Sequence, residues 1–124
     1  MKPADVEALC NLVGHCSYNA ENKERWRKLS RKLLKSVVEI LALPKGSYDL
    51  RYNPAGIACG GDATLHHDKV YVQFNPDMIC NWILVRTCEG RKDYAGGRNR
   101  SYSFDDLRRN GVGGLAEFVG KVMQ

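Results

Sequence analysis

The sequence predicts one α+β domain in which an antiparallel sheet carries helices on one of its faces. Apolar residues first recur at three- and four-residue steps and then, from Tyr48 onwards, at every second residue. The connections between the predicted strands are too short for parallel crossovers. The 124 residues fit a single domain, residues 1–124, that is large enough to bury a core.

Two helices are predicted at the N-terminal end, over residues 4–16 and about residues 20–43. In the first, the apolar side chains form one stripe suited to a core. The second has Asn19 as a candidate N-cap. It ends before Pro44, which cannot continue a helix, and Gly46, which can turn the chain. Its wide apolar sector contains Trp26, Leu29, Leu33, Val37 and Ile40.

A four-stranded antiparallel meander is predicted next, with strands over residues 48–52, 57–66, 70–74 and 81–88. The first strand alternates clearly, because Tyr48, Leu50 and Tyr52 fall on one face. The turns NPAG, HHDK and NPD separate the strands. Gly60 and Gly61 indicate a bulge in the second strand, or the close approach of another backbone.

Short C-terminal helices complete the predicted fold. Ser103 precedes the run FDDLRR, and Asp106 follows three residues on, which resembles a capping box although the usual partner is Glu or Gln. Asn110 and Gly111 are expected to close this helix. A small amphipathic helix then follows from the helical spacing of Leu115, Phe118, Val119 and Val122.

The predicted location is cytoplasmic. No apolar run approaches the roughly 18 residues that a membrane span requires, and the N-terminal stretch MKPADVEALC lacks the apolar core of a signal peptide. The five cysteines form no CxxC pair, and their odd number is typical of reduced thiols in a core. Cys10, His15 and Cys16 lie close in the sequence, but their spacing fits no usual zinc site.

The charge is unevenly distributed and indicates an anionic partner. The net charge is +5, yet residues 23–35 alone hold seven Lys or Arg residues and one acid. Four of these cations, Arg27, Lys28, Arg31 and Lys35, project from the side of the second helix opposite its apolar sector. The functional interpretation is a surface that follows phosphates. The alternative is an ordinary solvated helix face.

A second basic stretch, RTCEGRKDYAGGRNR over residues 86–100, follows the most apolar predicted strand. Its glycines would let backbone amides approach an anion, its cations would contact phosphates and Tyr94 would stack on a base. It is neither a Walker loop nor a dinucleotide fingerprint. The alternative is a hairpin loop with solubilising charges. The candidate binding residues in it are Arg86, Arg91, Lys92, Tyr94, Arg98 and Arg100.

No catalytic residue, metal ligand or cofactor site is predicted. Asp62, Glu89 and Lys92 are the only weak indication of a magnesium-dependent nuclease, and that chemistry needs more converging acids. His66 and His67 are adjacent on a strand, so their side chains should point to opposite faces and cannot readily share one ion. No nucleophile motif surrounds any cysteine.

The stretch GGDATLHHDKVYVQF followed by RTCEGRKDYAGGRNR resembles small proteins carried by bacterial phages, plasmids and integrated mobile elements. The resemblance covers roughly residues 45–100, the region of the predicted sheet and basic loop. No activity is established for those proteins, so the resemblance implies a context and no residue roles. Small proteins of such elements often bind DNA or block a host defence complex.

The leading hypothesis is a small, non-enzymatic binding module that engages nucleic acid or a nucleoprotein through the 86–100 stretch and the basic helix face. One alternative is an anti-defence inhibitor of the anti-CRISPR kind that binds a host protein complex. The other is the magnesium-dependent nuclease. A homo-oligomer is compatible with an open sheet edge. The placement of the two basic regions, on one face or on two, distinguishes a joint surface from separate roles.

Overall fold

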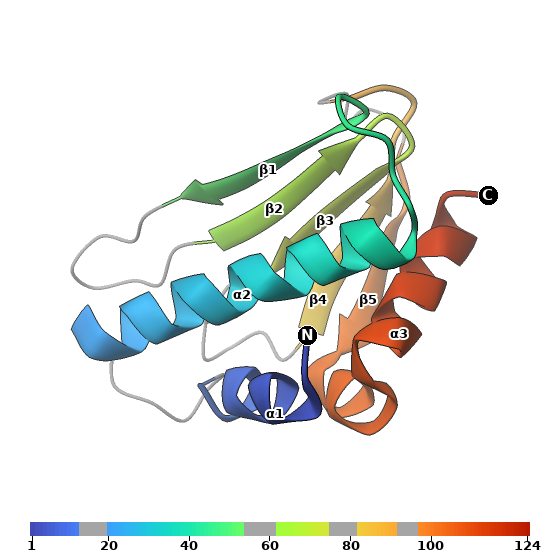
Figure 1. Cartoon of the computed structure of the whole chain (residues 1–124). Helices are drawn as coiled ribbons and strands as arrows, with labels where there is room; N and C mark the ends of the chain where they lie inside the picture. Colours follow the sequence, from blue (N-terminus) through green and yellow to red (C-terminus); the bar gives the residue numbers. More distant parts are fainter. Residues whose placement is uncertain (13–19, 54–61, 75–81, 92–96) are drawn as a thin grey trace.

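The fold is an α+β arrangement in which helices cover one face of a five-stranded antiparallel sheet (Figure 1). The computed structural model describes residues 1–12, 20–53, 62–74, 82–91 and 97–124. The elements are α1 (Pro3–Leu12), α2 (Ala20–Ile40), β1 (Tyr48–Asn53), β2 (Asp62–His67), β3 (Val70–Phe74), β4 (Trp82–Thr87), β5 (Asn99–Ser103) and α3 (Phe104–Val122). The predicted class and the two N-terminal helices are confirmed.

The second helix ends earlier than predicted, at Ile40, with a left-handed cap. Ala42 has a φ of 53°. Its amide donates to the carbonyl of Glu39, and the amide of Leu43 donates to the carbonyl of Val38, each at 3.1 Å. This pair of bonds satisfies carbonyls at the end of the helix before Pro44 is reached. The predicted extension of the first helix to residue 16 lies outside the described residues.

The sheet is a meander in the order β1-β2-β3-β4-β5, and each strand pairs antiparallel with the next. Leu50, Leu65, Val72 and Val85 pair in register across the first four strands and face the helices. β2 is described from Asp62, so the part of the predicted strand that held the glycine pair lies outside the described residues.

The fifth strand corrects the prediction of four. Residues 98–100 were assigned to a loop, but β5 pairs with β4 from Trp82 opposite Ser103 to Arg86 opposite Asn99. The sequence NRSYS holds one large apolar side chain, Tyr102, so it carries little of the alternation that marks a strand. Polar composition is usual on an edge strand, where it discourages pairing with other chains.

The C-terminal helix is one long element in place of the predicted short helices. Ser103 is its N-cap as predicted, because its hydroxyl accepts a 2.9 Å hydrogen bond from the amide of Asp106. Gly111 interrupts the helix with a φ of 70° and a ψ of −172°, and the chain resumes helical geometry directly afterwards. The break predicted at Asn110 and Gly111 is therefore present, as a kink between two helical parts of α3.

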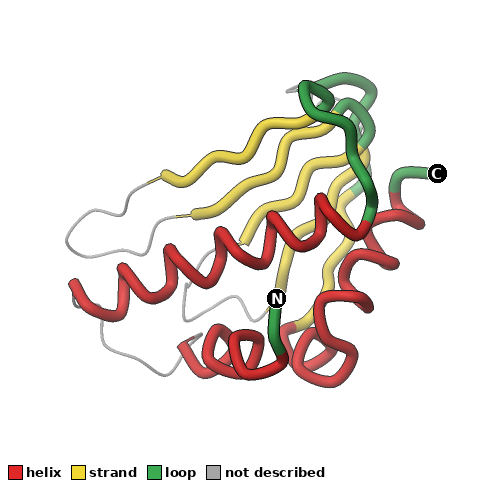
Figure 2. The backbone as a smooth tube through the Cα atoms, viewed as in Figure 1, coloured by secondary structure: helices red, strands yellow, loops and turns green. Residues whose placement is uncertain are grey.

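The core lies between the inner face of the sheet and the helices (Figure 2). α2 packs over β1 and β2, α3 packs over β4 and β5, and α1 fits against both helices. All three helices and the central strands contribute fully buried side chains, for example Leu9, Leu33, Ile83 and Leu107. None of the described helices is long and apolar enough to cross a membrane.

Candidate nucleic-acid interface

The outer side of α2 presents a continuous row of cations. The inner side of the helix is buried through Trp26, Leu33, Leu34 and Val37, so the residues on its other side project outward. At a rise of about 1.5 Å per residue, the cations cover about 15 Å of the helix axis. This surface is the basic face of α2, and its exposed members are Arg25, Arg27, Lys28, Arg31, Lys32 and Lys35.

Two of these cations are engaged by acids. Arg27 holds Glu24 through two hydrogen bonds, Nη2 to Oε1 at 2.8 Å and Nε to Oε2 at 3.1 Å. These hydrogen bonds lower the pKa of Glu24, so the pair stays ionised and its charges cancel locally. Lys32 Nζ lies 3.7 Å from Asp5 Oδ2 of α1. The remaining cations of the basic face form no ion pair within the described residues.

Arg31 connects the basic face to the edge of the sheet. Its guanidinium carbon lies 5.9 Å from the centroid of the Tyr52 ring, at the distance of a cation–π contact. Burial raises the pKa of Tyr52, while Arg31 and Arg27 act in the opposite direction. Through this contact the basic face of α2 touches β1, in addition to the packing of the apolar side of α2 on the sheet.

Arg86 lies on the other side of the sheet. It follows Val85, which is buried against the helices, and strand alternation therefore directs it away from them. Its Nη1 donates a 2.7 Å hydrogen bond to Oδ1 of Asn99 on β5. We call the side of the sheet opposite the helices the open face, because no described element packs on it. One register row crosses it and consists of Asp49, His66, Tyr71, Arg86 and Asn99.

Arg91 is held internally. Its Nη2 donates to the carbonyl of Gly46 at 2.6 Å, Nε lies 3.3 Å from Asp68 Oδ1, and Nη1 lies 3.6 Å from Asp49 Oδ2. These partners come from the turn before β1, the turn after β2 and β1 itself. Arg91 therefore ties the turns at one end of the sheet together, which leaves it less available to a phosphate than the sequence suggested.

The other cations of the 86–100 stretch are dispersed. Arg98 is exposed, and its backbone pairs with Thr87: its amide donates to Oγ1 at 2.9 Å and its carbonyl accepts from the Thr87 amide at 3.2 Å. Arg100 is exposed on β5 opposite Val85, so it projects to the helix side of the sheet. The predicted contacts of Lys92 and Tyr94 lie outside the described residues.

Gly97 serves packing in this stretch. A Cβ atom there would lie 2.1 Å from the carbonyl oxygen of Thr87 and 2.8 Å from Nε of Arg86. The returning backbone can pass over β4 only because the side chain is absent. The sequence suggested that this glycine lets a backbone amide approach an anion. In the structure its missing side chain instead makes room for Thr87 and Arg86 of β4.

The described cations of the two basic regions do not all lie on one side of the sheet. α2 covers the helix side of the sheet (Figure 1), and its basic face lies on that side, whereas Arg86 and Asn99 occupy register positions of the open face. The sheet and its core separate them. Arg86 therefore contacts a partner from the side of the sheet opposite α2, whereas Arg100 lies on the helix side.

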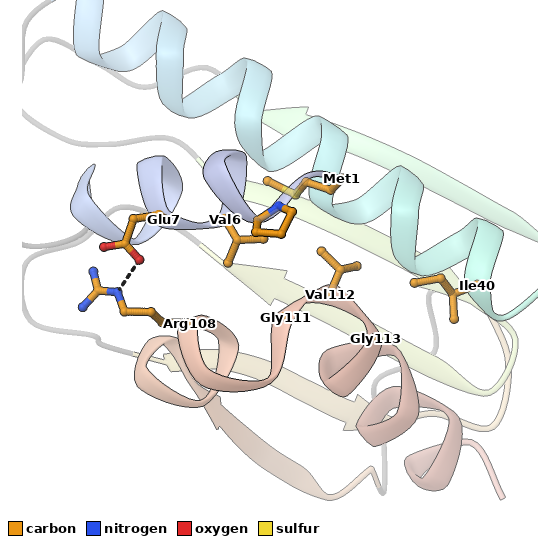
Figure 3. A pocket seen from close by; sticks show the side chains of 9 residues that line it. Met1, Val6, Glu7, Ile40, Arg108, Gly111, Val112 and Gly113 are labelled. Carbon is orange, nitrogen blue, oxygen red and sulfur yellow. Dashed lines mark ion pairs between the residues drawn. The ribbon is translucent and has the colours of Figure 1, made fainter.

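A pocket of about 230 Å³ lies where α1, the end of α2 and the bend of α3 meet (Figure 3). Its walls are mainly apolar, with Ile40 at the rim and a 3.1 Å ion pair between Arg108 Nε and Glu7 Oε2 at one end. Small-molecule sites usually reach about 300–1,000 Å³ and gather several convergent polar groups. This pocket lies away from the cation row and adds no charge to the interface.

Within the described residues, no three His, Cys, Asp or Glu side chains gather as they would around a metal ion. Glu89 is exposed, and the side chain of Asp62 lies outside the described part of the chain. His66 and His67 point to opposite faces as predicted: Nε2 of His66 lies 3.0 Å from Thr64 Oγ1, whereas Nδ1 of His67 accepts from the amide of Lys69 at 3.1 Å.

The described cysteines are free thiols. Cys10 is buried in the core, burial raises its pKa, and its Sγ donates to the carbonyl of Phe104 at 3.6 Å. Cys88 is half-buried and donates to the carbonyl of His67 at 3.2 Å. These contacts agree with the predicted structural role. Cys16, Cys59 and Cys80 lie outside the described residues.

The roles of two aromatic residues were not recognised from the sequence. Tyr52 was assigned to the inner face of the sheet, where it does lie, but its contact with Arg31 depends on how α2 crosses β1. Trp82 was counted within an apolar strand, yet 49% of its surface is exposed. The alternation of β4 could have identified it, because a strand that buries Ile83 and Val85 must turn Trp82 outward.

No protein-family model matches the chain, and comparisons with curated proteins and with solved structures found no match. The interface is therefore defined by the placement and charge of its own residues. Of these, six exposed cations lie on α2.

Proposed function

We propose that the protein is a small, non-enzymatic module of phage or mobile-element origin that binds nucleic acid, or a nucleoprotein, through the basic face of α2. The observation that carries this proposal is the row Arg25, Lys28, Arg31 and Lys35, which is exposed and forms no ion pair with other described residues. The resemblance of residues 45–100 to mobile-element proteins supports the context.

The spacing of the row suits a phosphate backbone. Arg25 and Lys35 are ten residues apart on one helix, which corresponds to about 15 Å of axis. Four exposed cations can neutralise up to about four phosphates of a nucleic-acid backbone. Binding would release condensed counterions and would depend strongly on salt. Contacts to phosphates carry no sequence information, so weak discrimination among sequences is expected.

The other candidate residues are expected to contribute to binding to different extents. Arg27 contributes less, because it must first give up its two hydrogen bonds to Glu24. Arg98 and Arg100 are exposed at the β5 edge, which is the edge of the sheet far from α2, so they would make separate contacts with the same partner. Lys92 and Tyr94 remain candidates for the same partner.

The proposal is tested by fluorescence anisotropy with labelled single-stranded DNA, duplex DNA and RNA. With four cations on phosphates, the affinity for duplex DNA should fall about 100-fold between about 50 mM and about 200 mM salt. No binding of any of the three probes at the lower salt concentration would contradict the proposal.

The inhibitor hypothesis uses the same cations against an acidic protein face. Polyglutamate of matched length separates the two classes of partner, because it offers carboxylates without the backbone spacing of a nucleic acid. When concentrations are expressed as moles of negative charge, unlabelled nucleic acid should displace the labelled nucleic-acid probe at a far lower concentration than polyglutamate does. Equal competition per charge would instead favour an acidic protein as the partner.

A further inference from the structure

The open face of the sheet has an unusual composition for a face that no described element covers. An antiparallel sheet that is covered on one side normally turns polar residues to the other. Here the outward positions of β4 hold Trp82, Leu84 and Arg86, and the neighbouring outward position of β3 holds Tyr71. No described helix or strand packs on these side chains.

Trp82 is the most accessible aromatic group on this face. Its exposed fraction is 49%, whereas Tyr71 is half-buried with its ring 5.1 Å from that of His66, centroid to centroid. His66 itself is buried and bonded to Thr64, so β2 offers little free surface. The accessible part of the open face therefore centres on β4 and β5, around the indole.

The open face also carries two arginines. Arg51 on β1 is exposed, and Arg86 is aimed across β4 and β5 by its 2.7 Å hydrogen bond to Asn99. The acid of the central row, Asp49, is drawn to Arg91 at 3.6 Å. Trp82 and Arg86 are four residues apart on one strand, a separation of about 13 Å. A stacking ring and an oriented guanidinium thus share one surface.

We propose that the open face binds unpaired nucleotides of single-stranded nucleic acid, with a base stacked on Trp82 and a backbone phosphate held by Arg86. Positive charge combined with exposed aromatic rings is the combination by which proteins bind single strands. In a duplex the bases are stacked on each other and cannot reach the indole. The inference rests on the proposed function for its class of ligand, but it concerns a different surface and adds a preference for single strands.

The test compares the wild-type protein with Trp82→Ala, using intrinsic fluorescence and anisotropy with oligothymidylate and with a duplex of equal length. Single strands should quench the part of the emission that Trp82→Ala removes, and the duplex should not. Because loss of base stacking costs about tenfold or more, Trp82→Ala should weaken single-strand binding by that factor and leave duplex binding unchanged. Circular dichroism verifies that the variant is folded.

Ile40→Ala is the matched control, because Ile40 is the other large apolar residue exposed in the described structure and lies on α2. It should bind both probes as the wild type does. Wild-type affinity of Trp82→Ala for single strands, or equal quenching by the duplex, would overturn the inference. The inference would also be overturned if the Trp82 fluorescence were quenched only when the protein self-associates.

The proposed function and this inference fail in different ways. If removal of Lys28 and Lys35 charges weakens duplex binding while Trp82→Ala binds single strands normally, only the inference is wrong. If Trp82 is quenched by single strands although the basic face of α2 can be neutralised without effect, the inference stands and the proposed role of α2 is wrong.

Discussion

The guanidinium carbon of Arg31 lies 5.9 Å from the centroid of the Tyr52 ring, so the cation row of α2 is joined to the edge strand of the sheet. The hydroxyl of Tyr52 is buried and has no hydrogen-bond partner among the described residues. The ring of Tyr52 therefore attracts the Arg31 cation. The hydroxyl loses its water on folding without gaining a described partner, which costs free energy.

Tyr52→Phe keeps the ring and removes this hydroxyl. We expect the free energy of unfolding to stay unchanged or to rise by up to about 1 kcal/mol, because no hydrogen bond is lost. Tyr52→Leu should instead lose about 0.5–1 kcal/mol of cation–π attraction in addition to packing. Urea unfolding measures both variants. A loss above about 1 kcal/mol in Tyr52→Phe would show that the hydroxyl is satisfied in the folded protein.

Gly97→Ala should destabilise the protein by about 1–3 kcal/mol, because its Cβ would overlap the Thr87 carbonyl and the Arg86 side chain. Gly90→Ala is the control, since a Cβ there meets nothing within 4 Å. It should change the free energy of unfolding by less than about 0.5 kcal/mol. Equal effects of the two substitutions in urea unfolding would argue against the close passage of Gly97 over β4.

Ala42→Gly should stabilise the protein by about 1 kcal/mol, because alanine is strained at the left-handed φ of 53°. The hydrogen bonds that end α2 do not depend on this side chain. Ala8→Gly within α1 should have the opposite effect and lose about 1 kcal/mol. Thermal unfolding provides the comparison, and a lower melting temperature for Ala42→Gly would contradict the assigned cap.

The stability of the protein should fall as pH decreases through the ordinary pKa of histidine. Burial is the largest cause that lowers the pKa of His67 below 6.5, so the unfolded chain binds a proton more readily than the folded one. The contribution of the neutral ring is complete above pH 6.5 and is lost below it, towards the lower folded-state pKa. Urea unfolding between about pH 8 and about pH 5 measures this loss.

His67→Asn serves as the control for the pH series, because its side-chain oxygen can still accept from the amide of Lys69. The variant should lack the part of the pH dependence that His67 contributes. An unchanged slope of stability against pH would show that His67 is not the responsible group.

The class of the fold and most of its elements could be predicted because hydrophobic periodicity reports them directly. The basic face of α2 was predicted for the same reason: helical spacing alone separates Lys28 and Arg31 from Leu33. β5 was missed because its stability comes from pairing with β4, and Arg100 and Ser101 within it carry no apolar pattern.

The relation between the two basic regions could not be predicted, because it depends on the strand register and on the face that the helices cover. Val85 and Arg86 are neighbours in sequence, yet one is in the core and the other projects from the open face. The engagement of Arg91 by Asp49 and Asp68 likewise requires turns that are distant in sequence to meet. From composition alone, residues 86–100 were interpreted as one basic loop.

The most direct test of the central claim is the salt dependence of duplex binding by two charge-matched double variants. Lys28→Gln with Lys35→Gln neutralises the basic face of α2, and Arg109→Gln with Lys121→Gln removes two exposed cations from α3. At about 0.9 per phosphate contact, the slope of log affinity against log salt should become shallower by about 2 in the first variant and stay unchanged in the second. Equal changes in both would contradict the claim, because net charge alone would then determine the affinity.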